Sequence, residues 1–150
     1  MHSSAATDQW ISFKVGSETY AQPIAAVKEV IPYTPPVPVP GAPQSVDGIL
    51  NVRGEVITVL CGLSLFVSGQ REAADDGRII ILDTGRGHIG VSVDAVGEIV
   101  TLEDGVIETN EHSMSHELIV GTARHGDQLL ILVDLEGYYE KATARTDAPA

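Results

Sequence analysis

Residues 48–59 have the sequence Gly-Ile-Leu-Asn-Val-Arg-Gly-Glu-Val-Ile-Thr-Val. Two apolar runs, Val46–Val52 and Val56–Leu60, lie on either side of the short break Arg53-Gly54-Glu55. β-Branched residues on both sides of a break that contains glycine are typical of a β-hairpin, because glycine tolerates the backbone angles of a tight turn. The segment therefore predicts two antiparallel strands with Arg53 at the turn.

Short β-rich segments recur in both directions from this hairpin. On the N-terminal side, Ile11, Phe13 and Val15 alternate with polar residues, and Gly16-Ser17-Glu18 turns the chain into Thr19–Ala21. On the C-terminal side, four further segments have strand character: Arg78–Asp83, Ile89–Val100, Leu118–Ala123 and Leu129–Asp134. Four or five strands in each half predict an all-β protein made of two small barrels side by side.

Three segments predict short helical turns. Pro23 opens the first, in which Ile24, Val27 and Ile31 share a face, and the others cover Leu63–Val67 and Leu135–Tyr139. Between the first turn and the hairpin, six of the residues from Pro32 to Pro43 are prolines, which predicts a rigid connector because proline lacks a backbone donor.

The polar segments set the expected domain boundaries. We expect a flexible N-terminus over residues 1–8, one domain over 9–139, and a polar, disordered tail over 140–150. Residues 68–77 are polar and small, and they predict a loop between the two halves of the domain.

Composition excludes several classes of function. Nine basic and twenty-one acidic residues give a net charge of −12, which disfavours binding to nucleic acid or to anionic lipid. No secretory signal is evident at the N-terminus, and no apolar run approaches the ~20 residues that span a bilayer. One cysteine, Cys61, fits a reduced compartment. We therefore expect a cytoplasmic protein without direct membrane insertion.

Motifs for catalysis or for metal binding are incomplete. Asp83-Thr84-Gly85 resembles the active-site turn of aspartic proteases, but one such turn requires a dimer to supply the second carboxylate. Gly85, Gly87 and Gly90 match a dinucleotide fingerprint whose helix is lacking, so a hairpin turn is the better interpretation. His112 and His116 lack a clear third ligand. We predict no cofactor, no metal and no enzymatic activity.

Arg53 remains unexplained by these motifs. A charged residue at a tight turn between two apolar strands either presents its guanidinium to a partner carboxylate or pairs within the chain with Glu55 or Glu29.

Taken together, residues 9–139 resemble the CheW-like family of chemotaxis coupling proteins. Residues 48–59 resemble its block Gly-Ile-x-Asn-Leu-Arg-Gly-x-x-x-Pro-Val. Four weaker blocks occur along the chain in the same order as in the family. They are Phe13-x-x-Gly16 with Tyr20-Ala21 and Pro23-Ile24, Val27-x-Glu29-Val30, Gly90-x-x-Val93-Asp94-x-Val96-x-Glu98-Ile99, and Gly121 with Leu130-Ile131-Leu132-x-Asp134.

The resemblance implies two intertwined five-stranded, SH3-like β-barrels that form a non-catalytic scaffold. Such a scaffold couples the cytoplasmic tips of chemoreceptors to the regulatory domain of a CheA-type histidine kinase, in membrane-associated receptor arrays. By position, the resemblance implies partner contacts at Arg53, Val27, Glu29, Gly48, Gly90, Val96 and Ile99. On the residues alone, Val27, Val96 and Ile99 are equally compatible with a place in the core.

The sequence also departs from the family pattern. Thr58 replaces a common proline, Cys61 and Gly62 stand where an aspartate and its neighbour are usual, and Gln22 stands where an apolar residue is usual. These departures leave open a related pathway that controls pili or gliding. Two other classes also stay open, namely a dimeric aspartic-protease-like hydrolase using Asp83 and a small-ligand-binding barrel with its site between the subdomains.

Overall fold

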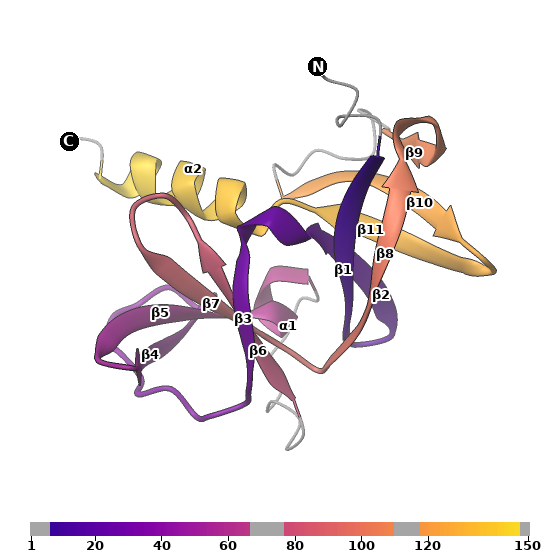
Figure 1. The fold of residues 1–150 in the computed structure, drawn as a ribbon. Helices are drawn as coiled ribbons and strands as arrows, with labels where there is room; N and C mark the ends of the chain where they lie inside the picture. Colours follow the sequence, from indigo (N-terminus) through magenta and orange to yellow (C-terminus); the bar gives the residue numbers. More distant parts are fainter. Residues whose placement is uncertain (1–6, 67–76, 110–117, 148–150) are drawn as a thin grey trace.

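The computed structural model describes residues 7–66, 77–109 and 118–147, which form two β-sheets and two α-helices (Figure 1). Sheet A has the strand order β8 (Ala95–Glu103), β1 (Thr7–Val15), β2 (Glu18–Pro23), β11 (Gln128–Val133), β10 (Ile119–His125) and β9 (Ile107–Glu108). Sheet B has the order β3 (Val27–Pro32), β6 (Arg78–Asp83), β7 (His88–Val93), β5 (Glu55–Cys61) and β4 (Val46–Val52). The helices are α1 (Gly62–Phe66) and α2 (Leu135–Asp147), with 3₁₀ turns η2 (Ile24–Ala26) and η3 (Asp104–Val106).

The chain enters and leaves sheet B only once. Sheet A is built from the two ends of the described chain, β1–β2 and β8–β11, whereas sheet B is built from the middle, β3–β7 (Figure 1). Each sheet contains one parallel strand pair, β2 with β11 in sheet A and β5 with β7 in sheet B. The other strand pairs of both sheets are antiparallel. The two subdomains are therefore intertwined along the sequence, as predicted.

The β4–β5 hairpin confirms the turn predicted at Arg53. Val52 pairs with Glu55, so Arg53 and Gly54 form a two-residue loop in which both have a positive φ, 53° and 87°. Such a turn matches the right-handed twist of the two strands. The Asn51 side chain supports it by accepting the Gly54 N–H at 3.0 Å.

Strand β6 is buried on both of its faces. Ile79 and Ile81 face the interior of sheet B, whereas Ile80 and Leu82 face a second core at the junction of the two sheets. All four side chains are at most 2% exposed. The unbroken apolar run of β6 follows from this double burial, because a strand with one solvated face would alternate polar and apolar residues.

The junction core combines buried side chains from both sheets and both helices: Phe13, Val15, Tyr20, Leu60, Leu63, Ile80, Leu82, Ile89, Val91, Val93, Leu118, Val133 and Leu135. The Tyr20 ring stacks on Phe13 and on Phe66, with centroid distances of 5.6 and 4.2 Å, and the Phe13 and Phe66 rings are tilted towards each other at 6.0 Å. A separate core fills sheet A around Trp10 and Leu132.

The structure corrects five details of the prediction. Sheet A has six strands rather than five, and the hydrogen-bonded ladders close neither sheet into a barrel. Residues 27–32 form a strand instead of continuing a helical turn after Ile24. The expected strand Ile89–Val100 divides at Asp94 into β7 and β8, which belong to different sheets. Helix α2 continues to Asp147, so the polar stretch after Tyr139 is largely helical rather than a disordered tail.

The predicted boundary near 68–77 also differs from the structure. Most of this segment lies outside the described residues, but the strands before and after it, β5 and β6, belong to the same sheet. The segment therefore does not separate the two sheets. The predicted N-terminus over 1–8 lies outside the described residues except for Thr7 and Asp8, with which β1 begins.

Replacement of Phe13 by alanine tests the importance of the junction core. Because Phe13 is fully buried, Phe13→Ala removes packing from both sheets, and we expect a loss of about 3–5 kcal/mol in the free energy of unfolding. The matched control Val56→Ala, at a side chain that is 61% exposed, should cost less than about 1 kcal/mol. Urea denaturation followed by circular dichroism measures both, and equal losses would contradict the assignment of the core.

Candidate functional site

Arg53 and Glu29 form an ion pair across the open side of sheet B. Glu29 lies in β3 and Arg53 follows β4, the two outer strands of the sheet, and the Arg53 Nη1 group donates a hydrogen bond to Glu29 Oε2. At the opposite end of the same two strands, the Tyr33 hydroxyl donates to Asp47 Oδ2 at 3.4 Å. Side-chain contacts thus connect β3 with β4, which no backbone ladder joins, and the Arg53–Glu29 pair holds the β4–β5 turn against β3.

A second side-chain contact lies beside the first. Glu55 Oε1 is 2.7 Å from His88 Nδ1, which places the first residue of β5 against the first residue of β7. Both pairs, together with Lys28, line a small cavity of about 70 Å³ whose floor is apolar. Its remaining lining residues are Val52, Ile57 and Ile81. This end of sheet B therefore presents a compact cluster of opposite charges.

The geometry favours the ionised forms of Arg53 and Glu29. The hydrogen bond from Arg53 is the main cause that lowers the pKa of Glu29, and the positive charges of Arg53, Lys28 and His88 act in the same direction against partial burial. The Arg53 side chain is 70% exposed and the Glu29 side chain 22%. Glu29 therefore orients a guanidinium whose surface is still largely open to a partner, which suits recognition of a carboxylate.

Val96 and Ile99 lie on β8, in sheet A. Ile99 pairs with Ile11 and Val96 pairs with Phe13, so β8 has one more residue than β1 in this interval and forms a β-bulge. The bulge includes Gly97, where a Cβ would lie 2.5 Å from Ser12 Oγ, and the Ser12 hydroxyl donates to the Glu98 carbonyl at 3.0 Å. Ile99 is 53% exposed, whereas Val96 is half-buried against the junction core.

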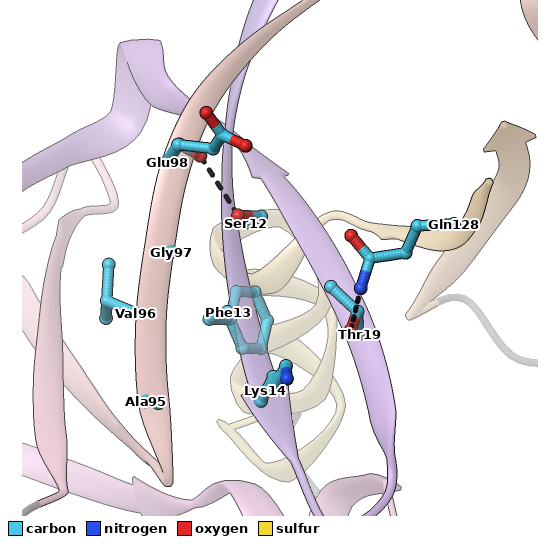
Figure 2. A pocket seen from close by; sticks show the side chains of 9 residues that line it. All are labelled: Ser12, Phe13, Lys14, Thr19, Ala95, Val96, Gly97, Glu98 and Gln128. Atoms are coloured by element: carbon cyan, nitrogen blue, oxygen red, sulfur yellow. Dashed lines mark hydrogen bonds between the residues drawn. The ribbon is translucent and has the colours of Figure 1, made fainter. Parts of the chain in front are cut away.

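An open groove of about 500 Å³ runs beside this bulge, across β8, β1 and β2 towards β11 (Figure 2). Its depth follows from the small residues Ala95, Gly97 and Ser12, and Lys14, Glu98 and the hydrogen-bonded pair of Thr19 and Gln128 also line it. Val96 completes the lining on the β8 side (Figure 2). The groove itself has apolar and polar parts, and the exposed Ile99 lies further along β8 and outside its lining.

Burial gives the other three candidate residues a structural reason for their type. Val27 begins β3 and packs partly against the junction core. Gly48 is buried with a φ of 152°, and a Cβ there would collide with the Val37 carbonyl oxygen. A Cβ on Gly90 would lie 2.8 Å from Ile79 Cγ2, inside sheet B. The structure therefore joins Arg53 with Glu29, places Val96 near Ile99, and leaves the two glycines beneath the surface.

Sequence reasoning missed His88 and Lys28. The contact of His88 with Glu55 depends on the parallel alignment of β5 and β7, which no local pattern specifies. Glu55, one of the two possible partners of Arg53, pairs with His88 instead.

The motifs considered for catalysis have structural explanations where they are described. The exposed Asp83 carboxylate accepts the Gly85 N–H at 2.8 Å, and positive φ angles at Gly85 and Gly87 form the β6–β7 turn. His112 and His116 lie outside the described residues. Within the described ranges, no three side chains of His, Cys, Asp or Glu gather as metal ligands, and no helix is long and apolar enough to cross a membrane.

Comparisons with known proteins agree on one family. The CheW-like domain model matches residues 9–142. The chain is 27% identical over 134 residues to the chemotaxis protein CheW of Treponema pallidum, covering 85% of this chain and 79% of the relative. It is 24% identical over 145 residues to CheW of Bacillus subtilis, with 95% and 93% coverage. The crystal structure of the scaffolding protein TtCheW from Thermoanaerobacter tengcongensis superposes with a TM-score of 0.80 at 28% identity, covering 89% of this chain and 92% of that one.

Removal of Arg53 tests its effect on Glu29. In Arg53→Ala, we expect the pKa of Glu29 to rise towards the ordinary glutamate value, because its main stabilising hydrogen bond is lost. A lowered carboxyl pKa contributes stability that is present above the unfolded value and is lost as the pH falls through the folded value. Carboxyl carbon shifts in an NMR titration measure the change, with Arg124→Ala, an exposed arginine of sheet A, as the control. An unchanged Glu29 titration in Arg53→Ala would contradict the pairing.

Proposed function

We propose that this chain, which belongs to the CheW-like domain family, is a chemotaxis scaffold that couples receptor cytoplasmic tips to the regulatory domain of a CheA-type histidine kinase. Members of this family are non-catalytic scaffold proteins, in line with the prediction that the chain is not an enzyme. The names of its relatives indicate chemotaxis, and the coupling role is our more specific proposal within that function. The scaffold would act in the cytoplasm, recruited to membrane-associated arrays.

The observation that carries this proposal is the separation of the candidate surfaces between the two sheets. The oriented Arg53 guanidinium lies at one end of sheet B, whereas Ile99 and the groove beside Val96 lie on sheet A. A coupling protein needs two surfaces that can be occupied at the same time. Two sheets fixed to each other by one core provide such surfaces with a constant geometry.

The two surfaces differ in chemistry. Arg53 offers a charged, mostly exposed contact that can select a partner carboxylate, while Ile99 offers apolar area that can pack against a helix. A few such contacts give modest affinity, which an array of linked partners strengthens through multivalency.

Reversal of the Arg53 charge tests the sheet B surface. We expect Arg53→Glu to weaken the binary complex with one partner, the kinase regulatory domain or a receptor-tip hairpin, by tenfold or more, about 1.4 kcal/mol. The other binary complex should keep its affinity. Sedimentation velocity with both partners, followed by titration calorimetry, measures the two affinities.

Two controls separate the partner contact from the internal ion pair. Arg124→Glu makes the same charge change on β10 of sheet A, and it should leave both affinities unchanged. The double variant with Arg53→Glu and Glu29→Arg restores opposite charges across sheet B. If Arg53 itself meets the partner, this variant stays weak in binding. Equal binding by wild type and Arg53→Glu would contradict a role for this surface.

Replacement of Ile99 tests the sheet A surface. We expect Ile99→Asp, at a side chain that is 53% exposed, to weaken the partner that Arg53→Glu spares, without loss of folding stability beyond about 1 kcal/mol. The same pair of titrations measures this effect, with Leu129→Asp, at a side chain that is 47% exposed on β11, as the matched control. Weakening of the same partner by both Arg53→Glu and Ile99→Asp would argue against two separate surfaces.

A further inference from the structure

An open cavity of about 480 Å³ is lined by residues of α1, α2 and the β2–β11 pair of sheet A. Its lining joins the two halves of the fold, because α1 follows β5 and contacts both β5 and β7 of sheet B. Figure 1 shows α1 between the strands of the two sheets. Small-molecule sites in proteins typically have volumes of about 300–1,000 Å³, so the cavity is large enough to enclose such a ligand.

Most of the side chains that line the cavity are aromatic or aliphatic. Tyr20 on β2 stacks on Phe66 at the end of α1 with a centroid distance of 4.2 Å, and Tyr138 of α2 also lines the cavity. The aliphatic lining residues are Leu65, Leu118, Ile119 and Ile131. A ligand enclosed by these side chains would gain free energy by burying its own apolar surface, and aromatic neighbours favour a planar aromatic ring.

The polar side chains of the lining are uncharged. Each carries a hydroxyl group, on Tyr20, Tyr138, Ser45 or Ser64. Among the described residues that line the cavity, none carries an acidic or a basic side chain. A charged ligand would lose hydration on entry without meeting an opposite charge, so the lining favours a neutral ligand.

The Tyr20 hydroxyl is the group that most directly indicates a ligand. Tyr20 is only 4% exposed, yet within the described part of the chain its hydroxyl makes no hydrogen bond. Buried hydroxyl groups normally have a partner. Burial is the main cause that raises the pKa of Tyr20, and the charge of Glu18 acts in the same direction. The hydroxyl is therefore protonated at neutral pH and can both donate and accept a hydrogen bond.

The cavity is separate from the surfaces considered for partner binding. It shares no lining residue with the groove beside Val96 or with the charged cluster around Arg53. A ligand in this cavity would therefore leave both of those surfaces exposed, and its binding can be measured without a partner protein.

We propose that this cavity binds a neutral aromatic small molecule with one hydrogen-bonding group, and that the Tyr20 hydroxyl is the polar contact for that group. The ring of the ligand lies among the aromatic and aliphatic side chains of α1, α2, β10 and β11. Because the ligand contacts α1, α2 and sheet A together, its binding stabilises the folded arrangement of these elements.

An NMR titration of the full chain with 2-naphthol, a neutral planar aromatic alcohol, tests the site. At neutral pH we expect saturable shift changes at the methyl groups of Leu118, Ile119 and Ile131, with a Kd of about 1 mM or lower. The charged analogue 2-naphthoate should bind about tenfold more weakly or worse. Saturation with 2-naphthol should also raise the Tm of the chain. No partner is present, so the result is separate from that of the coupling proposal.

Tyr20→Phe removes the hydroxyl group and keeps the ring stack. We expect this variant to bind 2-naphthol about fivefold more weakly, because one hydrogen bond to the ligand is lost. Without ligand, its Tm should be no lower than that of wild type, since the hydroxyl has no partner within the described chain. The matched control Tyr33→Phe removes a hydroxyl that donates to Asp47, outside the cavity, and should leave the affinity for 2-naphthol unchanged.

A second variant keeps the test decisive if Tyr20→Phe fails to fold by circular dichroism. Ser64→Phe on α1 adds a ring to the lining of the cavity, and it should abolish the saturable shifts. Three results would overturn the proposal: no saturable shifts with 2-naphthol at these methyl groups, equally tight binding of 2-naphthoate, or equal affinity for 2-naphthol in wild type and in the variant that folds.

Discussion

One hydrophobic core shared by two sheets is the constraint on which the rest of the structure depends. Sheet B buries one face around Ile79 and Ile81 and its other face against Phe13 and the junction core. Strand β6 must therefore be apolar at every inner position, and Gly90 on the neighbouring strand must lack a side chain because Ile79 occupies that space. Neither sheet would have both faces covered without the other, so the two subdomains form one cooperative unit.

Local patterns predicted the hairpins but not the assignment of strands to sheets. The turns at Gly16 and at Arg53-Gly54 follow from a glycine, which tolerates positive φ, between two apolar runs. By contrast, β2 with β11 and β5 with β7 pair in parallel over long sequence separations, which local residues do not encode. The change of sheet at Asp94 was missed because the apolar pattern continues through it, although its carboxylate accepts the Gly16 N–H at 2.8 Å.

The length of α2 was missed for a related reason. Its second half is polar, so its sequence resembles a tail, whereas its stability depends on the Asp134 cap and on the burial of Leu135 and Tyr138 in its first turns. Tertiary packing of one short apolar face can support a longer polar helix. Gln22 was recognised as unusual on its strand, but its partners lie more than a hundred residues away and become visible only in the fold.

The candidate site shows the same division between local and long-range information. The turn at Arg53 was predicted from its own residues, and the sequence left Glu29 and Glu55 as alternative partners. In the fold, Arg53 pairs with Glu29, because sheet B curves and brings its outer strands β3 and β4 together. The parallel pairing of β5 with β7 places Glu55 beside His88 instead. A single guanidinium held in this way loses less conformational entropy on binding than a free arginine, since Glu29 has already fixed its orientation. Arg53 therefore recognises a partner carboxylate best when the fold, rather than the partner, has fixed the orientation of its guanidinium. Contacts between β3 and the β4–β5 turn set this orientation, and they depend in turn on the core that curves the sheet.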